Sequence, residues 1–487
     1  MKFKGRIDQY CLRSKNGQHF MRYESLKNCA HNITGATGEG EFLLLFNEEL
    51  ERIKTFINLK LQELRMTLQR LQYYRDQEKC GGHIRNTDSQ IPEKLLFKEF
   101  IDDFVTELED MEKFIMLNRE GMDRVIEKHD LITGITSDWY FSQNHGAFFA
   151  RYLNELDAFL FHISILYTET RSKDKAKNNK IRENVEEKLF ERNILKHLVK
   201  TEDVFAVKTE LIKHLPISIR NDMYRISPQL NCNPEPHESL IESTPPFMTL
   251  VSSVFLDNSD LLSYHSLQRL DESATAIRLR WHNLSQGREV VPLASPLDSI
   301  VYVEKKTYNS EREPIASLCD SAKPETRLRN EAQKVINRDN LEPLVRTACK
   351  RMIFQSPDDN EVRITLDSDL IFVDEGGRQN SQWKRNEDEI VENRHYCEFP
   401  YSILKVELGS TFPEWLRLLL EHPSVRHMEK FSKSQQATTC FYPHRIKEFP
   451  DWFADVTIHG SKTGFSKVCM ATISRNYYEA RSAFKKS

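Results

Sequence analysis

The chain has 487 residues, and single cores rarely grow that large, so we expect about two to four domains. Charged residues make up 29% and hydrophobic residues 39% of the sequence, which excludes a wholly disordered chain. The formal net charge of -4 excludes a general attraction to nucleic acid or anionic membranes, so an anion site must be a local concentration of Lys and Arg.

The nine cysteines show neither a C-x-x-C pair nor a His/Cys cluster at zinc spacing, so we expect free thiols in a cytosolic protein. The N-terminus lacks the apolar core of a signal peptide. No stretch approaches the ~18 to 20 apolar residues that cross a bilayer. We therefore expect no transmembrane segment in this chain.

Apolar residues recur at intervals of three and four through the first 170 positions. This spacing predicts amphipathic helices over 42–71, 95–117, 118–129 and 147–170. Helices in this order favour an antiparallel bundle over residues 1–170. The segment 171–184 is polar, basic and without periodicity, which predicts a linker.

Beyond the linker, short alternating segments broken by Pro, Gly and Asn predict a largely antiparallel β-domain over 185–450. The segments 276–281, 300–307, 362–367 and 401–408 each have one apolar and one ionic face. An ordinary sheet would place the ionic face in water. An inverted barrel would close it around a lumen instead. Periodicity alone leaves both arrangements open.

Specific strings in this region resemble motifs of the VTC domain, the polyphosphate polymerase module of vacuolar transporter chaperone complexes. In the family's order they are AIRLRW (276–281), VEKKT (303–307), FPYSIL (399–404) and KFSK (430–433), with further matches at 211–216, 253–258, 351–355 and 413–415. The first half is similar to an SPX domain, the helical sensor of inositol pyrophosphates. Its markers lie at 1–3, 23–27, 117–121 and 128–130.

The resemblance implies an α+β protein. An SPX-like antiparallel helical bundle would precede an antiparallel β tunnel barrel with flanking helices, the triphosphate tunnel fold. In that family the basic lumen binds ATP, transfers its γ-phosphoryl group to a growing polyphosphate chain, and needs a divalent metal such as Mn²⁺ or Mg²⁺.

Residues of this chain match the family's functional positions one by one. The phosphate-binding positions are Arg278, Arg280, Lys306, Arg351, Arg363 and Lys433. The metal candidates are Glu407 and Glu304. The inositol phosphate positions are Tyr23, Lys27 and Lys128, with Arg124 adding a positive charge.

Two departures leave catalysis open. Catalytic members place a metal-binding glutamate two residues before a lysine, whereas this chain has Lys405 and then Glu407. Both side chains still face the same side of a strand, and each charge is displaced by roughly 6 to 7 Å along the strand from its place in the catalytic members. We also expect the family's first tunnel strand near 204–207, where Val204 replaces a lysine and Lys200 and Lys208 are nearby substitutes.

Three functions fit these observations: a polyphosphate polymerase regulated by inositol pyrophosphates, a degenerate regulatory subunit or phosphate sensor, and a tunnel-fold triphosphatase. The expected partners are ATP, polyphosphate, inositol pyrophosphates and other VTC-type membrane subunits, but no nucleic acid. Family members usually end in a small transmembrane region, whereas 451–487 is a polar tail here. We therefore expect the protein in the cytosol, or held by a partner at the cytosolic face of a vacuole-like or acidocalcisome-like membrane.

Overall fold

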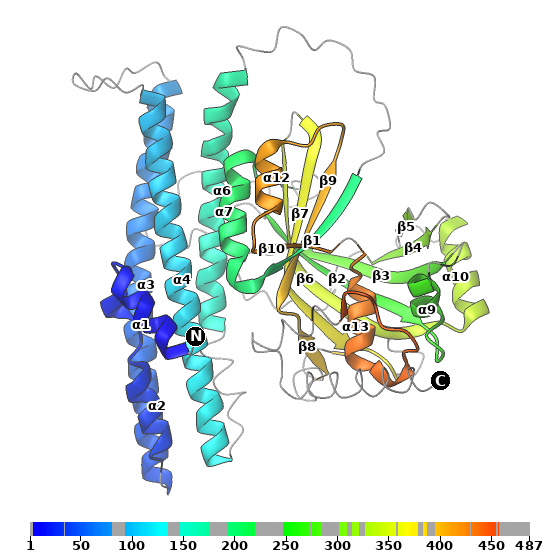
Figure 1. The fold of residues 1–487 in the computed structure, drawn as a ribbon, viewed down its shortest axis with the longest axis horizontal. Coiled ribbons are helices and arrows are strands. Elements are labelled where there is room, and N and C mark those ends of the chain that lie inside the picture. The colour runs from blue at the N-terminus through cyan, green and yellow to red at the C-terminus, as the bar shows by residue number, and fades with distance from the viewer. Residues whose placement is uncertain are drawn as a thin grey trace.

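A computed structural model describes residues 3–456 apart from several gaps, the longest of which are 80–92, 135–146, 176–192, 220–246, 285–300, 321–326 and 387–394. A bundle of long helices stands beside a curved antiparallel sheet (Figure 1). This arrangement confirms the predicted α+β fold class, with the helical region first along the chain. Most of the expected polar tail, 457–487, lies outside the described residues.

The helical bundle is formed by the N-terminal part of the chain. Its described α-helices are α1 (Phe3–Arg13), α2 (Tyr23–His31), α3 (Gly35–Lys79), α4 (Glu93–Thr133) and α6 (Ala147–Lys175). The long helices α3, α4 and α6 run alongside one another (Figure 1). Their apolar residues are buried at the predicted spacing, as Ile53, Ile57 and Leu61 show.

The helices expected over 95–117 and 118–129 are one continuous helix, α4, so the expected break between them is wrong. Asn118 lies at the expected break, but its buried amide does not end the helix. Its Oδ1 accepts a hydrogen bond from Met21 N at 2.9 Å, and its Nδ2 donates one to Phe114 O at 2.7 Å. The amide therefore ties α4 to the segment before α2, and α4 ends only before Gly134, whose φ is +70°.

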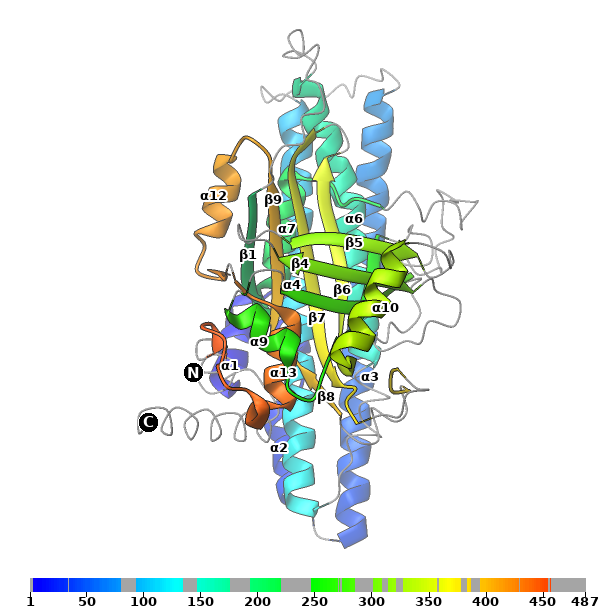
Figure 2. The same ribbon diagram turned by 90° about the vertical axis from the view of Figure 1, so that its right-hand side faces the viewer.

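The sheet domain, which we define as the described residues of 193–456, contains one antiparallel sheet. Its strand order is β10-β1-β9-β7-β6-β2-β3-β4-β5, with β8 paired to β7. The strands are β1 (Asn193–Lys200), β2 (Met248–Asp257), β3 (Thr275–Leu284), β4 (Tyr302–Tyr308), β5 (Pro314–Asp320), β6 (Glu342–Ser356), β7 (Asp359–Asp374), β8 (Tyr396–Glu398), β9 (Tyr401–Leu408) and β10 (Val425–His427). The sheet curves strongly, so that β3, β4 and β5 cross β6 and β7 steeply in Figure 2.

Helices flank this sheet. They are α7 (Val204–His214), α9 (Leu262–Arg269), α10 (Arg327–Asp339), α12 (Glu414–Leu420) and α13 (Lys433–Phe441). In Figure 1, α7 lies between α6 and the sheet. The apolar face of the sheet, with Phe354, Ile364 and Leu404, shares one continuous core with α6 and α7.

The ionic face is turned away from that core, yet it is not simply in water. Glu304 and Asp367 each keep only 4% of their surface exposed. Charged side chains so deeply buried require partners. The ordinary open sheet, with its ionic face in solvent, is therefore wrong for this part of the molecule, and the enclosed arrangement is favoured.

The two halves of the chain are packed together. The expected linker begins inside α6, which continues to Lys175, and Arg171 Nη1 donates a hydrogen bond to Ile212 O of α7 at 3.2 Å. The C-terminal end of the described chain is also packed. The core that contains Phe431, just before α13, includes Trp452, Phe453 and Val456. The folded unit thus continues past the expected boundary at residue 450.

Candidate phosphate-binding face

Strand register brings the expected phosphate-binding residues of the strands onto one surface, because directly opposite residues of antiparallel strands point to the same side of the sheet. Arg278 lies opposite Glu304, and Arg280 opposite Ser253. Further along, Arg351 is opposite Asp367 and Arg363 is opposite Glu407. We call this surface the ionic face; its described charged side chains include Lys196, Arg278, Arg280, Glu304, Arg351, Arg363, Asp367, Lys405 and Glu407 on the strands, and Lys433 from α13.

The first cluster on this face joins β3, β4 and β2. Arg278 Nε donates to Glu304 Oε2 at 2.6 Å, and Arg280 Nη1 lies 3.0 Å from Glu304 Oε1. Arg280 Nε also donates to the Ser253 hydroxyl at 3.1 Å. One carboxylate therefore serves two guanidinium groups. Burial, followed by repulsion from Arg278, lowers the pKa of Arg280 to about 9.

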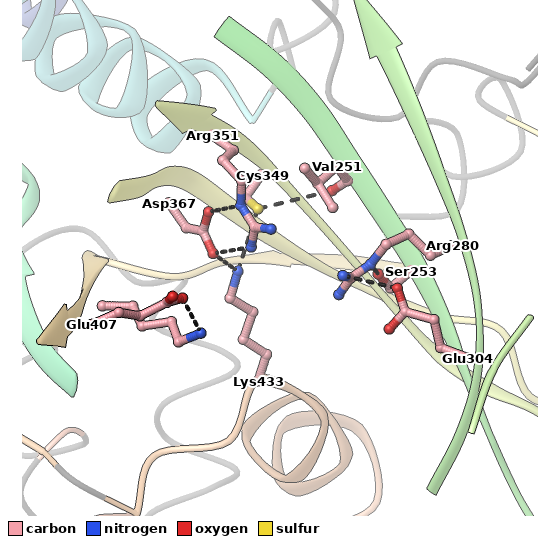
Figure 3. A network of polar contacts seen from close by, with 10 residues as sticks. Val251, Ser253, Arg280, Glu304, Cys349, Arg351, Asp367, Glu407 and Lys433 are labelled. Atoms are coloured by element: carbon pink, nitrogen blue, oxygen red, sulfur yellow. Dashed lines mark hydrogen bonds and ion pairs between the residues drawn. The ribbon is translucent and has the colours of Figure 1, made fainter. Parts of the chain in front are cut away.

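The second cluster joins β6, β7 and α13 (Figure 3). Arg351 donates two hydrogen bonds to Asp367, from Nε to Oδ1 at 2.6 Å and from Nη2 to Oδ2 at 2.8 Å. Lys433 Nζ contacts Asp367 Oδ2 and Cys349 Sγ, the latter at 3.4 Å. Burial favours the neutral acid, but attraction to Arg351 and Lys433 outweighs it and holds the pKa of Asp367 well below its usual range.

The third cluster carries the exchanged charges. Lys405 Nζ donates to Glu407 Oε1 at 2.7 Å, and the two side chains are 37% and 15% exposed. Lys405 lies opposite Thr365, and Glu407 lies opposite Arg363. Both therefore face the side that the strand period predicts. Arg363 Nε is buried and has no hydrogen-bond partner among the described atoms.

On the described part of this face, cations outnumber carboxylates. Basic side chains come from β1, β3, β6, β7, β9 and α13, which span most of the sheet order. Guanidinium groups at such density bind phosphate oxygens through charge-assisted, bidentate hydrogen bonds. The arrangement suits a multiply charged, extended anion.

The model of the VTC domain matches residues 191–442, more than half of the chain. This chain belongs to the VTC domain family. It is 24% identical to vacuolar transporter chaperone complex subunit 4 of Schizosaccharomyces pombe, across 94% of this chain and 66% of that protein. Subunit 2 of the same yeast is also 24% identical, over 89% of this chain and 64% of that protein.

Subunit 4 of the vacuolar transporter chaperone complex of Trypanosoma brucei brucei is 26% identical, over 55% of this chain and 37% of that protein. The chain thus spans less than two thirds of the length of these relatives. A solved structure, the PH1819 protein of Pyrococcus horikoshii OT3, matches at 9% identity and a TM-score of 0.24, covering 49% of this chain and 95% of that one.

The first strand of this VTC domain is β1, so the expectation of a first strand near Val204 is wrong. Residues 204–207 begin α7, where Val204, Val207 and Leu211 are buried at helical spacing. Lys196 in β1 lies opposite Lys405 and donates to Phe431 O at 3.0 Å. It is therefore Lys196 that places a first-strand lysine on the ionic face, a position signalled only by the alternation in NILKHLVK (193–200).

The two lysines considered as substitutes for the missing lysine at Val204, Lys200 and Lys208, lie in different parts of the structure. Lys208 points into the contact between the two halves, where its Nζ lies 2.7 Å from Asp157 Oδ1 of α6. It is not part of the ionic face. Lys200 ends β1 opposite Tyr401. Lys306 lies in β4 opposite Ala276, and its side chain is outside the described residues.

The described residues do not form a ready divalent-metal site. No group of three or more His, Cys, Asp or Glu side chains suited to a metal comes together in the part of the chain that the structure describes. Glu304 is held by Arg278 and Arg280, and Glu407 accepts from Lys405. A metal would have to displace these cations or take most of its ligands from phosphate and water.

The inositol phosphate candidates lie at the N-terminal end of the bundle. Tyr23 begins α2, and its ring meets the Phe3 ring edge-on with centroids 5.0 Å apart. Burial raises the pKa of Tyr23, while the charges of Lys27 and Arg124 oppose that rise. These three residues therefore lie together. Lys128 follows Arg124 by one helical turn on α4.

Acidic residues partly neutralise these cations. Lys27 Nζ lies 3.2 Å from Glu24 Oε2, and Arg124 Nη2 lies 2.9 Å from Glu120 Oε1. Both pairs are partly exposed and lie on one helix each, so they contribute little to stability. An incoming polyanion can replace them at low cost.

Proposed function

We propose that the ionic face binds phosphate chains, namely the triphosphate of ATP and inorganic polyphosphate. The convergence of cations from six elements on one enclosed surface carries this proposal. Arg363 Nε is buried without a hydrogen-bond partner among the described atoms, and Arg280 shares its carboxylate partner Glu304 with Arg278. Phosphate oxygens are the chemically matched acceptors.

We further propose that the bound chain receives the γ-phosphoryl group of ATP. A terminal phosphate oxygen of the chain would attack the γ-phosphorus in line, the bond from that phosphorus to the β–γ bridging oxygen would break, and ADP would leave. The attacking oxygen already carries negative charge, so the reaction needs positioning and charge neutralisation more than a base. Arg278, Arg280 and Arg351 supply such charges.

We propose that the required divalent metal enters bound to the substrate and is not a resident ion of the protein. The described carboxylates do not fit a resident divalent site, so Mn²⁺ or Mg²⁺ is best considered as part of metal–ATP, with phosphate oxygens and water as its main ligands. Glu304 and Glu407 remain the candidate protein ligands on the ionic face.

A second candidate function is a regulatory subunit that holds phosphate chains without extending them. The Lys405–Glu407 ion pair favours it, because the carboxylate stands two residues from its place in catalytic relatives and is occupied by an ammonium group. Errors of tenths of an ångström already weaken metal placement. Binding would survive such a change, whereas turnover would not.

The helical bundle is proposed to sense inositol pyrophosphates through Tyr23, Lys27, Arg124 and Lys128. We also propose that the chain assembles with other subunits of a vacuolar transporter chaperone complex, as its relatives' names indicate. None of the described helices is long and apolar enough to cross a membrane. A cytosolic position, free or at a vacuole-like or acidocalcisome-like membrane through such partners, accords with the proposed substrates.

The test compares binding with turnover. Purified chain is titrated with inorganic tripolyphosphate by calorimetry, and failure to bind would overturn the proposal. The same protein is then incubated with ATP and Mn²⁺ and its products are separated on a gel. Long polyphosphate supports the polymerase, orthophosphate alone indicates a triphosphatase, and binding without product supports the regulatory subunit.

A charge-exchange variant sharpens this test. We expect Lys405→Glu combined with Glu407→Lys to restore the order found in catalytic relatives and to raise polyphosphate synthesis by about 100-fold, the scale of a misplacement near 1 Å or more. Lys405→Glu alone is the matched control, since it puts two carboxylates side by side. No gain in the double variant, with tripolyphosphate binding intact, would contradict the view that the exchange limits activity.

A further inference from the structure

A buried group of charges lies where the helical bundle meets the sheet domain. Lys208 of α7 donates to both oxygens of Asp157 of α6, at 2.7 and 2.8 Å. Beside this pair, the Thr209 hydroxyl donates to Glu109 Oε1 of α4 at 2.6 Å. Lys208 and Asp157 are each only 7% exposed. The contact between the halves is therefore polar as well as apolar, and its ion pair is largely shielded from water.

Glu112 of α4 brings a further carboxyl group to this place. It is 7% exposed and lines a cavity of about 280 Å³ between α1, α4 and the turn Thr201–Asp203 that precedes α7. The other charged or titratable side chains lining the cavity are Arg6, Tyr10, Arg13, Lys113 and Glu202. Arg6 is already paired with Glu120 at 2.7 Å. The described contacts of Glu112 include no ion pair.

We propose that the contact between α4 and α7 is a proton-linked latch, which holds the helical bundle against the sheet domain while Glu112 is protonated and loosens when that side chain ionises. The carboxyl groups of Asp157 and Glu109 lie near Glu112, and Lys208 is the only basic group that the α7 side supplies among the described neighbours of Glu112. An ionised Glu112 would add a third negative charge to a buried site already held by one lysine. This latch lies outside the ionic face and does not depend on the function proposed above.

The direction of the pH effect follows from the surroundings of Glu112. Burial above all, with Asp157 and Glu109 adding to it, raises the pKa of Glu112 from its ordinary 4.5 to about 8, against the opposing pull of Lys208 and Lys113. Tyr10 does not titrate in this range, because burial raises its pKa to about 12. The closed contact thus binds a proton that the opened contact releases between pH 4.5 and 8, so the contact is strongest at low pH and weakens as pH rises through this window.

Opening would reach the sheet through the segment after α7. Gln355 N donates to Pro216 O at 3.1 Å and Ser218 N donates to Ile353 O at 2.8 Å, so this segment runs along the end of β6. Between these two residues, Ile217 N donates to the Ser164 hydroxyl of α6 at 3.2 Å and holds the segment to the bundle. A change at the latch is therefore carried by bonded backbone to the strand that bears Arg351.

The test follows amide hydrogen exchange in α7 of the full chain between pH 5.5 and 8, comparing Glu112→Gln with wild type at each pH so that the intrinsic exchange rate cancels. For one linked proton, opening in wild type rises by about tenfold per pH unit, whereas the neutral glutamine removes this dependence. The protection gained by Glu112→Gln should therefore grow by about the same factor per unit. Glu107→Gln, at an exposed position of α4, should behave as wild type.

A second variant tests the assignment of the charges. Asp157→Asn leaves Lys208 to Glu112, which lowers the pKa of Glu112, so the pH-dependent rise in α7 exchange should level off below pH 8. A ratio between Glu112→Gln and wild type that stays constant over this pH range would overturn the proposal. So would an unchanged levelling-off point in Asp157→Asn with the chain still folded.

Discussion

Arg280 illustrates how single residues specify the ionic face. The alternation in AIRLRW places it on the side opposite Trp281, which is fully buried. Its side chain is 14% exposed and shares Glu304 with Arg278. Two cations with one carboxylate between them favour a further anion, which is the physical reason to expect phosphate at this point.

We expect Arg280→Ala to weaken tripolyphosphate binding by about 10- to 100-fold, because a hydrogen bond to a charged group contributes about 1.5 to 3 kcal/mol. Arg280→Lys should recover only part of this loss, since an ammonium group lacks the planar fork. Calorimetric titration measures both. Arg338→Ala, in an exposed arginine of α10 that is 70% accessible, is the control. Equal binding by all three variants would exclude Arg280 from the site.

For single residues, the sequence predicts the side of the strand on which a residue lies better than it predicts the partners that the residue contacts. Arg278, Arg280, Arg351 and Arg363 could be placed on one face because strand alternation is local and strict. The role of Asp367 as partner of both Arg351 and Lys433 could not be predicted, because it depends on where α13 docks. Whether these residues bind substrate stays a prediction.

Among the elements, α13 closes one end of the ionic face. Ser432 caps this helix by accepting from Gln435 N, and the following residue, Lys433, reaches across to Asp367 of β7. Phe431 packs against Phe399 and Trp452 on the apolar side of the same segment. The helix is therefore positioned by one buried carboxylate and one aromatic cluster.

We expect Asp367→Asn to destabilise the fold by about 3 to 5 kcal/mol, because it leaves Arg351 and Lys433 without their buried counter-charge. Tripolyphosphate should restore more stability to this variant than to wild type, since its oxygens can take over both cations. Thermal unfolding with and without the ligand measures the difference. A smaller ligand-induced shift than in wild type would show that phosphate does not reach Arg351 and Lys433.

Element boundaries show why some predictions failed. Asn118 is a poor helix former, but tertiary hydrogen bonds to Met21 and Phe114 keep it inside α4. The segment at Val204 is apolar and short, which periodicity cannot assign to strand or helix. In the folded protein this segment packs against α4 and α6, and these contacts favour the helical conformation.

For the whole molecule, the shared core has a thermodynamic consequence. Residues of α3, α4 and α6 belong to one apolar cluster with β6, β7 and β9. Sequence alone predicts two separate halves, because pattern describes the face of each element and not the partner that covers it. Because α7 packs against both halves, we expect them to unfold together.

We expect a single calorimetric unfolding transition for the full chain. Tripolyphosphate at 100 times its dissociation constant should stabilise it by about 2.7 kcal/mol. Because the helices share that core, far-UV circular dichroism and tryptophan fluorescence should shift together by the same temperature. Two transitions, of which only one responds to the ligand, would show that the halves unfold independently.

The surplus of cations on the ionic face also makes the molecule behave as a small ion exchanger. We expect the positive potential around Arg280 and Arg363 to attract small anions from solution. If the ionic face binds phosphate chains as proposed, these chains would compete there with other anions of the solution, such as sulfate or orthophosphate. Apparent affinity will therefore depend on the identity of the buffer anion as well as on ionic strength.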